Sequence, residues 1–498
     1  MNTPIKVYDA RWEVNEFDDA AVRRLFEATL GYASQIGVDT ISITRDTRLG
    51  CARVMDIGIE LAVEAGFQVF TCFDPISTPM SYFASMQLSS QHPNTMGLAI
   101  TASHNPAQYV GVKFTVPTVQ SIGYDCGPLN GLAKVEELYR SEFSLENKPG
   151  GSLSVIENPA EQYIRYSMQT AGVQDGSLEG LSLVLDCFNG SAGPELFRAL
   201  TRAGVKVIPQ RLVPNGEFPT GSPNPASQNK MDTAIEVAKS QDAQLVMGID
   251  GDGDRVVFGD QQGIFSAGFV MIPILKALLS RETSNQRIQV LYDPKVNPLA
   301  LEQWSKLNVE PVLFRNGHSQ IKDFMREIDA IAGAEESGHF YNRLDLGDIR
   351  VWSENSLLTI LLFLDAVKKN PDWIKEVRAM QEQVFTSGEF NYAFETDEIR
   401  DRAMAAILSF FEQTGSTMAT ETPEGIDLGG VVIYNGVEIT NSGIKLNENW
   451  YSGYIRIATN EKGVVRSYIS SANHTLGKDI ETELRRILEN EFNGIITE

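Results

Sequence analysis

Gly97-Leu-Ala-Ile-Thr-Ala-Ser-His-Asn-Pro106 is the stretch around which the chain is organised. The apolar run ends at Ile100, and a polar loop carrying Ser103 follows at once, as expected for a buried strand that leads into a site. In open α/β sheets, ligands bind at such strand ends. A hydroxyl at Ser103, an imidazole at His104 and an ammonium at Lys113 lie close together in the sequence, which suits transfer of a phosphoryl group. The competing interpretation is an ordinary hydrophilic turn, so further motifs are needed to decide between the two.

Length, composition and charge limit the class of protein. The chain has 498 residues, 42% of them hydrophobic, and a formal net charge of −23. Its length predicts roughly three or four domains, and its apolar content predicts buried cores rather than disorder. The negative charge disfavours nucleic acid and anionic membranes as partners, so an anionic ligand needs a local cluster of cations. Four cysteines without a pairing pattern, no apolar signal core and a longest apolar run of only 357–364 predict a cytoplasmic protein.

Hydrophobic periodicity predicts an α/β chain that repeats one plan. Helical spacing over 18–37 and alternation over 40–44 begin the first unit, and a linker at 148–152 ends it. A composition change near Gly388 opens a last unit with helices at 397–413 and 476–491. The other predicted elements are a helix ending near 65, strands at 67–70, 97–100, 181–185, 205–208, 245–249, 288–292, 312–314 and 330–332, and helices at 194–203 and 231–240.

The loop Asp250-Gly-Asp-Gly-Asp-Arg255 directly follows an apolar strand. Three carboxylates in five residues repel one another unless a cation lies among them, and the glycines allow the turn that aims them at one point. Carboxylate oxygens suit Mg²⁺ or Mn²⁺, so all three aspartates are candidate ligands. An EF-hand is excluded, because Arg255 and Gln261 stand where its glycine and its last glutamate belong. A solvated acidic turn is the alternative.

Three of the five histidines, His104, His318 and His339, lie in loops distinguished by other polar residues. Each has the chemistry of a proton carrier near neutral pH, although a single such histidine is more often a hydrogen-bonded structural residue. Lys295 and Arg255 add fixed positive charge. Glu335 and Ser337 offer acceptors for sugar hydroxyls, with helix capping as the alternative.

These motifs occur in the order found in a known family. The segments are Tyr8-Asp-Ala-Arg11, Arg45-Asp-Thr-Arg48, Thr101-Ala-Ser-His-Asn-Pro106, Phe218-Pro with Pro223-Asn-Pro225, Asp250–Arg255, Asp293-Pro-Lys295, Asn316-Gly-His-Ser319 and Glu335-Glu-Ser-Gly-His339. Together they resemble the α-D-phosphohexomutases, which include phosphoglucomutases and phosphomannomutases. The resemblance implies three topologically similar α/β domains plus a smaller α+β C-terminal domain around a central cleft. The implied domains are a phosphoserine-loop domain over 1–150, a metal-binding domain over 151–263, a sugar-recognition domain over 264–386 and a C-terminal phosphate-binding lid over 387–498.

The resemblance also implies a mechanism. Ser103 would carry a phosphate, pass it to a hexose monophosphate and recover the other phosphate from the hexose 1,6-bisphosphate, which serves as intermediate and activator. The overall reaction would interconvert the 1- and 6-phosphates of a hexose, glucose or mannose or both. One Mg²⁺ would be held by Ser103, Asp250, Asp252 and Asp254. The implied catalytic residues are Ser103, His104, Lys113, Arg11 and Arg255, and the implied substrate-binding residues are Lys295, His318, Glu335, Ser337, His339, Arg456, Thr459 and Asn460. The expected partner is a small-molecule phosphosugar, and the expected state a monomer or homodimer.

The last domain departs from the family pattern. The family has Arg-x-Ser-Gly/Asn-Thr-x-Pro, whereas this chain has Arg456-Ile-Ala-Thr-Asn-Glu-Lys-Gly463, with Ala458 in place of the serine. Losing a hydroxyl bond to a dianion costs about 1.5–3 kcal/mol. A catalytically weak or silent phosphosugar-binding paralogue therefore stays open, as does a metal-dependent phosphatase. An α/β-hydrolase is disfavoured, since Ser103 lacks the Gly-x-Ser-x-Gly elbow.

Overall fold

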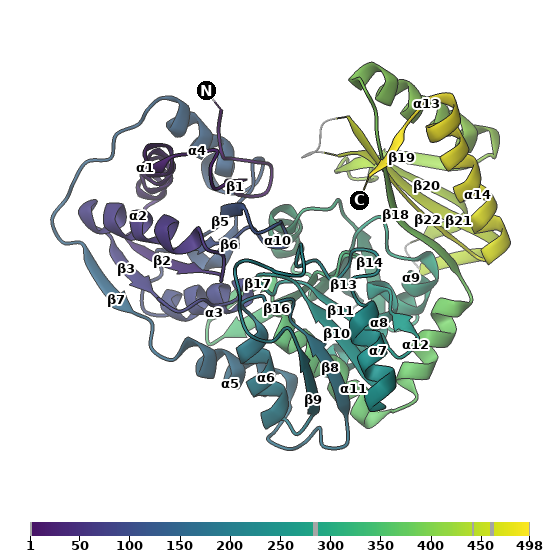
Figure 1. Cartoon of the computed structure of the whole chain (residues 1–498), viewed down its shortest axis with the longest axis horizontal. Helices are drawn as coiled ribbons and strands as arrows, with labels where there is room; N and C mark the ends of the chain where they lie inside the picture. The colour runs from purple at the N-terminus through teal and green to yellow at the C-terminus, as the bar shows by residue number, and fades with distance from the viewer. Residues whose placement is uncertain (1, 282–286, 441–442, 459–462, 498) are drawn as a thin grey trace. The chain divides into compact units, whose positions relative to one another are not determined.

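The computed structural model describes residues 2–281, 287–440, 443–458 and 463–497 (Figure 1). The chain folds into two compact units, which are described in turn. The first unit comprises residues 1–264, 317–332 and 337–370. The second comprises residues 265–316, 333–336 and 371–498.

The first sheet holds the Ser103 loop. Its strand order is β1-β5-β4-β2-β3-β7, with β6 beside β5; β4, β2, β3 and β7 run parallel, and β5 returns antiparallel to β4. Helices α1, α2 and α4 contribute to one apolar core with these strands. The strands are β1 (Ala10–Glu13), β2 (Thr40–Arg45), β3 (Gln68–Thr71), β4 (Thr95–Ile100), β5 (Tyr109–Val116), β6 (Gln120–Ser121) and β7 (Ser152–Val155), and the helices are α1 (Asp19–Gln35), α2 (Cys51–Glu64), α3 (Thr78–Ser89) and α4 (Gly131–Arg140).

The second sheet repeats that plan. In the order β12-β11-β10-β8-β9, strands β10, β8 and β9 are parallel and β11 returns antiparallel to β10, just as β5 returns beside β4. A polar loop therefore follows the corresponding strand in both sheets, Ser103 after β4 and the aspartates after β10. The elements are α5 (Pro159–Ala171), β8 (Ser182–Asp186), α6 (Gly193–Arg202), β9 (Lys206–Gln210), α7 (Asp232–Gln241), β10 (Leu245–Ile249), β11 (Val256–Asp260) and β12 (Gly263–Ile264).

The last part of the first unit packs against both sheets' helices. Helix α11 contacts α5, and Asn355, which caps α11 at Leu358, also accepts a hydrogen bond from Tyr163 at 2.8 Å. Strands β16 and β17 form an antiparallel hairpin. The elements are α10 (His318–Glu327), β16 (Phe340–Leu346), β17 (Ile349–Glu354) and α11 (Ser356–Lys369).

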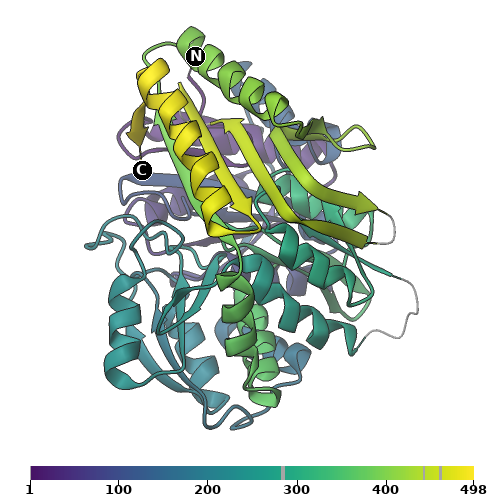
Figure 2. The ribbon, with the colours of Figure 1, turned by 90° about the vertical axis from the view of Figure 1, so that its right-hand side faces the viewer.

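The second unit combines a parallel strand pair with a larger antiparallel sheet. Strands β13 and β14 are parallel, and the six-stranded sheet runs β19-β20-β21-β22-β18-β23. Helix α14 lies across that sheet and contacts β18 and β22 (Figure 2). The elements are α8 (Ala267–Leu279), β13 (Ile288–Tyr292), α9 (Pro298–Ser305), β14 (Val309–Leu313), α12 (Trp373–Glu382), β18 (Phe385–Ala393), α13 (Asp397–Gln413), β19 (Thr417–Glu421), β20 (Asp427–Thr440), β21 (Gly443–Ile457), β22 (Val464–Ser471), α14 (His474–Arg486) and β23 (Ile495–Thr497). Strand β15 (Ala332–Ala334) spans the chain boundary between the units.

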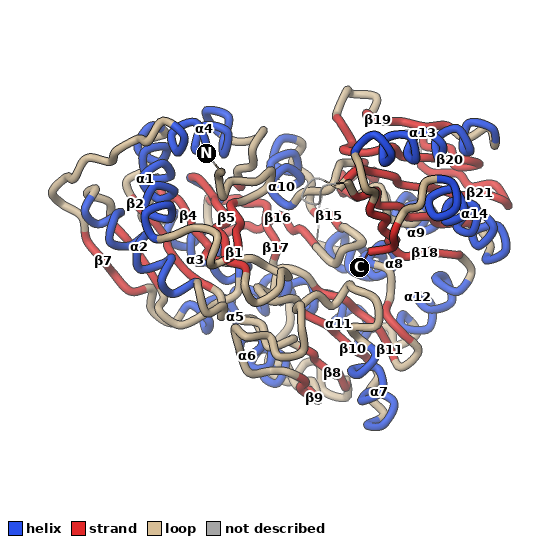
Figure 3. Tube along the Cα trace, turned by 45° about the horizontal axis from the view of Figure 1, so that its top comes forward, coloured by secondary structure: helices blue, strands red, loops and turns tan. Residues whose placement is uncertain are grey.

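The mixture of helices and strands predicted from the sequence is confirmed along the whole described chain (Figure 3). The predicted strands at 245–249 and 288–292 and the helix at 397–413 match to the residue. Asp18 caps α1, its carboxylate accepting from the Ala21 N–H. Within the described residues, no helix combines the length and apolar character needed to cross a bilayer.

Helix α3 is absent from the elements predicted by periodicity, and its burial explains why. Ten of its twelve residues are buried, so it has no polar face and no amphipathic stripe to reveal it. Ser77 nevertheless caps it, accepting from the Met80 N–H, with a proline in the first turn. Helix α5 is absent from them too, although its apolar residues and the left-handed Gly172 after it are ordinary helix signals.

Candidate active site

The Ser103 backbone adopts a left-handed conformation, with φ of 51°. Two buried groups hold it there: its N–H donates to Thr101 Oγ1 at 2.9 Å, and Arg48 Nη2 donates to its carbonyl oxygen at 2.5 Å. The hydroxyl thereby points at the second sheet's acidic loop, donating to Asp250 Oδ2 at 3.0 Å. His104 Nδ1 lies 3.3 Å from the same hydroxyl oxygen.

Two glycines let the acidic loop approach Ser103. A Cβ on Gly251 would lie 2.6 Å from the Ser103 carbonyl oxygen, so only glycine fits this contact. Gly253 has φ of 80°, and its N–H donates to Asp250 Oδ1 at 3.1 Å. The Arg255 N–H donates to the same oxygen at 3.1 Å, closing the turn. The loop thus follows from its Asp-Gly alternation.

Lys113 supplies the charge that balances this loop. Its Nζ donates to Asp252 Oδ2 at 2.7 Å and also to Asp254 Oδ2. Burial and Asp254 push the pKa of Asp252 upward, but Lys113 and a 2.6 Å hydrogen bond from Thr78 Oγ1 outweigh them and lower it. Burial likewise opposes the charge on Lys113, yet the two aspartates raise its pKa well above the ordinary range. Lys113 is therefore a fixed cation here.

One carboxylate of the loop is left without enough positive charge. Burial, followed by the charges of Asp252 and Asp254, raises the pKa of Asp250 well above its usual value. The three aspartates each offer an oxygen within 4.8 Å of the others, and Oδ1 of both Asp252 and Asp254 is buried without a hydrogen-bond partner among the described residues. Hard oxygens converging around unbalanced negative charge fit a divalent cation such as Mg²⁺.

Arg11 is held beside the Ser103 loop. Its Nη1 donates to Asn105 Oδ1 and its Nη2 to Asp9 Oδ2, both at 2.5 Å. Burial raises the pKa of Asp9, but Arg11 and then His318 lower it to about 2. His318 Nε2 lies 3.9 Å from Asp9 Oδ2, so Asp9 links the first motif of the chain to the Gly-His-Ser segment.

Burial lowers the pKa of all three histidines of this cluster. Burial first, then Arg255 and Arg11, lowers the pKa of His104 well below its ordinary value. Burial and Arg255 do the same for the pKa of His339, whose Nε2 accepts from Arg255 Nε at 3.0 Å. The pKa of His318 is shifted downward as well, chiefly by burial.

Lys295 and Arg456 lie in the second unit, together with Glu389. Lys295 Nζ is 3.3 Å from Glu389 Oε2, and Arg466 Nη1 donates to Glu389 Oε1 at 2.9 Å. Arg456 and Arg466 are directly opposite on β21 and β22. Burial opposes the charge on Glu389, but Lys295, then Arg466 and Arg456, lower its pKa to about 2. Three cations here lie around the carboxylate of Glu389.

The loop after β15 carries Glu335 in the second unit and Ser337 in the first. Helix capping is the alternative role for these two residues. The carboxylate that caps a helix is that of their neighbour Glu336, which accepts from the Ala267 and Gly268 N–H groups at 3.1 Å each and from Ser266 Oγ at 2.7 Å. Burial raises the pKa of Glu336 to about 7.

The predicted site residues divide between the two units. The first unit contains Ser103, His104, Lys113, Arg11, Arg255, Asp250, Asp252, Asp254, His318, Ser337 and His339, and the second contains Lys295, Glu335 and Arg456. Thr459 and Asn460 lie outside the described residues. Residues that sequence reasoning does not select are Asp9, Thr78, Lys322, Glu354, Glu389 and Arg466. Of these, only Asp9 stands in a motif, beside Arg11.

Comparisons with known proteins identify relatives of this chain. Models of the α/β/α domains I, II and III of phosphoglucomutase/phosphomannomutase match residues 4–125, 161–263 and 269–385. The chain is 28% identical over 404 residues to a phosphomannomutase of Vibrio cholerae, covering 78% of this chain and 82% of that one. It is 28% identical over 363 residues to a phosphomannomutase/phosphoglucomutase of Pseudomonas aeruginosa, covering 72% of this chain and 73% of that one.

Solved structures show the same fold. A phosphoglucomutase/phosphomannomutase family protein of Burkholderia thailandensis gives a TM-score of 0.75 at 22% identity, covering 97% of this chain and 96% of that one. A protein described as a putative phosphomannomutase, from Thermus thermophilus, gives a TM-score of 0.71 at 22% identity, covering 98% of this chain and 100% of that one. Since the three domain models together span well over half of the sequence in the expected order, the chain belongs to the phosphoglucomutase/phosphomannomutase family of intramolecular phosphotransferases.

Proposed function

We propose that this chain is a Mg²⁺-dependent phosphohexomutase that interconverts the 1- and 6-phosphates of glucose, mannose or both through a phosphorylated Ser103. The observation that carries the proposal is the 3.0 Å hydrogen bond from Ser103 Oγ to Asp250 Oδ2. It puts a hydroxyl nucleophile in contact with a buried carboxylate trio of the kind that binds Mg²⁺. The relatives named phosphomannomutase and phosphomannomutase/phosphoglucomutase support the substrate class.

Asp250, Asp252 and Asp254, with the phosphorylated Ser103, would hold the ion. When bound, Mg²⁺ would neutralise negative charge on the phosphoryl oxygens. A phosphoserine adds about −1.5 to −2 charges at neutral pH, which the surrounding cations must offset. Lys113, Arg11 and Arg255 are the cations of the first unit that would do so.

In the forward half-reaction, the free hydroxyl of a hexose monophosphate attacks phosphorus. The bond from phosphorus to Ser103 Oγ breaks, a bond to the sugar oxygen forms, and a hexose 1,6-bisphosphate results. The attacking hydroxyl loses a proton and Ser103 Oγ gains one as its bond to phosphorus breaks. His104, whose Nδ1 is 3.3 Å from Ser103 Oγ, is placed to deliver the proton to that oxygen. Lys113, ion-paired to two aspartates, acts as a charge rather than as a base.

The second half-reaction returns the other phosphate of the bisphosphate to Ser103 Oγ by the reverse bond changes. For that, the intermediate must turn round without escaping, which a closing cleft between the four proposed domains (1–150, 151–263, 264–386 and 387–498) would permit. Exclusion of water would protect the phosphoserine from hydrolysis. Lys295, Glu335, Ser337, His318, His339, Arg456, Thr459 and Asn460 are the proposed sugar and phosphate contacts.

The direct test is the intact mass of the purified protein. One added phosphate, located at Ser103 by peptide mapping, supports the proposal. Ser103→Ala should abolish conversion of glucose 1-phosphate in an assay primed with glucose 1,6-bisphosphate, whereas Ser89→Ala, which removes a buried hydroxyl bonded to the Ser85 carbonyl at 2.8 Å, should keep it. Residual turnover above about one hundredth in Ser103→Ala would remove the phosphoserine from the mechanism, since a covalent intermediate cannot form without the nucleophile.

A phosphosugar-binding paralogue with little turnover is the second candidate. Ala458, at the place of the family's serine, favours it. The primed assay separates the two, because a silent protein that carries phosphate on Ser103 would be the paralogue. Release of free phosphate from glucose 1-phosphate would instead identify a phosphatase.

A further inference from the structure

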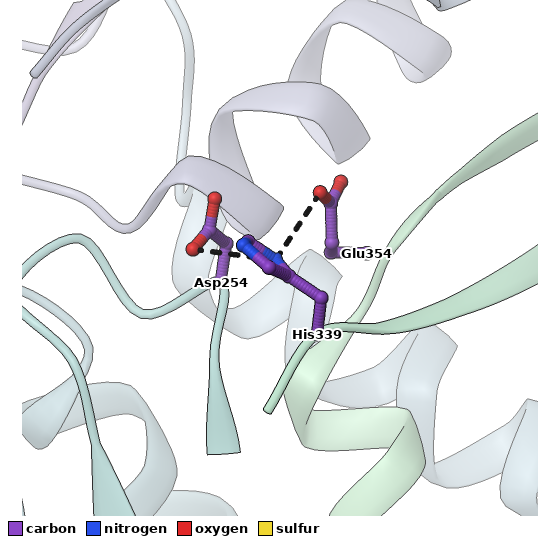
Figure 4. A group of neighbouring side chains, drawn as sticks. All are labelled: Asp254, His339 and Glu354. Atoms are coloured by element: carbon purple, nitrogen blue, oxygen red, sulfur yellow. Dashed lines mark ion pairs between the residues drawn. The ribbon is translucent and has the colours of Figure 1, made fainter. Parts of the chain in front are cut away.

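Three buried polar atoms of the first unit, none with a hydrogen-bond partner among the described residues, meet at one point beside the acidic loop. They are Asp254 Oδ1, His339 Nδ1 and Glu354 Oε1 (Figure 4). His339 Nδ1 lies 3.7 Å from the aspartate oxygen and 3.6 Å from the glutamate oxygen. Each of the three residues is at most 4% exposed. Glu354, at the end of β17, has no part in the mechanism above.

The contact on the other side of the imidazole fixes its tautomer. Arg255 Nε, which can only donate, lies 3.0 Å from His339 Nε2, so Nε2 must be an unprotonated acceptor. In a neutral imidazole the single proton is then on Nδ1. That N–H faces the two carboxylates. Since Nδ1 has no lone pair to offer, a second metal ion at this point is disfavoured, although two carboxylates and an imidazole are present.

Glu354 is held in turn from its far side. Lys322 Nζ donates to Glu354 Oε2 at 2.8 Å and lies 4.4 Å from the centre of the Tyr82 ring. Lys322 and Glu354 are 2% and 1% exposed. With Oε2 occupied by Lys322, the Oε1 atom is the one directed at the imidazole. At 3.6 Å this is an electrostatic contact, which a small ring rotation would turn into a hydrogen bond.

We propose that Glu354 is a positioning residue that orients Arg255 through His339. Glu354 holds the imidazole by Nδ1–H, and Nε2 holds the guanidinium by Nε–H. The terminal N–H groups of Arg255 are then the part of its fork that binds phosphoryl oxygens. The inference rests on the proposed function for the role of Arg255, but the tautomer of His339 does not depend on that function.

The first experiment therefore needs no turnover. Nitrogen-15 NMR of the imidazoles in the wild-type chain, which has only five histidines, reports the tautomer directly. The His339 signal is assigned by its loss in His339→Gln. We expect protonation on Nδ1 and an unprotonated Nε2. A proton on Nε2 would overturn the proposal.

The second experiment compares Glu354→Gln, Glu354→Asp and the double variant Glu354→Gln/Lys322→Met. The double variant avoids leaving a buried unpaired lysine, so it separates positioning from stability. We expect kcat to fall roughly 10–100-fold in both glutamine variants, as for other residues that orient a ligand-binding group, with KM changed much less. Glu354→Asp should recover part of kcat, and the Nδ1 signal of His339 should shift in the glutamine variants, because the carboxylate that this N–H faces is gone.

Wild-type kcat in a folded double variant, or an unchanged His339 signal, would exclude the positioning role. If the wild-type chain itself lacks mutase turnover, the proposed function fails, while the shift of the His339 Nδ1 signal between the wild type and the glutamine variants still decides whether Glu354 positions the imidazole.

Discussion

The ammonium of Lys113 lies 2.7 Å from Asp252 Oδ2, and neither side chain is more than 2% exposed. The two residues come from different sheets, Lys113 from β5 and Asp252 from the loop after β10. A buried ion pair therefore connects the Ser103 sheet to the acidic loop. Charges that would otherwise be costly to bury are already in place before any phosphosugar arrives.

Replacing Lys113 by Met should destabilise the chain by about 3–5 kcal/mol, because it leaves two buried carboxylates unpaired. Urea unfolding measures this. Lys134→Met is the matched control, since Glu137, the partner of Lys134, is 66% exposed and such pairs contribute only about 0–1 kcal/mol. Equal losses in the two variants would show that the buried pair has no special weight.

Asp252→Asn should weaken Mg²⁺ binding, so that the Mg²⁺ concentration needed for half-maximal turnover rises by about tenfold or more. This is equivalent to about 1.4 kcal/mol of binding free energy. The amide keeps the shape of the side chain but removes a negative charge from the trio. A Mg²⁺ titration of the initial rate measures the change. The exposed Asp348→Asn is the control, and an Asp252→Asn titration that overlays it would count against the metal loop.

Stability should fall with rising pH in the region where Glu195 stays protonated. Burial raises the pKa of Glu195 from 4.5 to about 8. Its contribution is thus present below pH 4.5 and is lost as the pH rises toward 8, because the unfolded chain ionises first. At about 1.4 kcal/mol per pKa unit the loss reaches roughly 5 kcal/mol at most.

Glu195→Gln should remove this dependence and flatten the profile of unfolding free energy between about pH 5 and about pH 8. The side chain hydrogen-bonds to Ser77, so the amide retains a partner. Urea unfolding at several pH values gives the profile. Exposed Glu217→Gln should run parallel to the wild type. A Glu195→Gln profile that also runs parallel would mean that Glu195 is ionised in the folded chain.

Glu389→Gln should tighten binding of inorganic phosphate to the second unit by roughly tenfold, about 1.4 kcal/mol. The substitution removes the carboxylate that contacts Lys295 and Arg466 and leaves more positive charge for an added anion, while Lys295 keeps Asp293 at 3.9 Å. The shift of Tm with phosphate concentration measures it, with exposed Glu395→Gln as the control. Unchanged or weaker phosphate binding would show that Glu389 does not compete with anions there.

The first two sheets and their helices could largely be predicted, because the sequence signals that mark them are local. Asp18 before α1, Gly66 after α2 and the Asp-Gly alternation after β10 each act within a few residues. Helix α3 could not be found in this way, since burial on nearly all sides leaves it without a pattern.

The site was predictable where a motif marks it and hidden where a partner comes from afar. Ser103 and the aspartates are recognisable from their loops. Glu354 meets His339 through the return of β17 beside β16, and Glu389 meets Arg466 through strand pairing in the last sheet. Neither glutamate has a sequence signal of its own, because tertiary contacts alone give it a role.

The first unit is discontinuous, and that affects how it is made on the ribosome. Glu354 follows Ser103 by about 250 residues, so at about 5–20 residues per second they emerge roughly 10–50 s apart. Meanwhile the nascent chain carries Lys113 and the aspartates, but residues 317–332 and 337–370 of the first unit are not yet translated. The ribosome must first translate 265–316, which belongs to the other unit. A transcript cut short before codon 337 would therefore yield a polypeptide with every marked motif of the first two sheets but a candidate active site that lacks His339 and its neighbour Glu354.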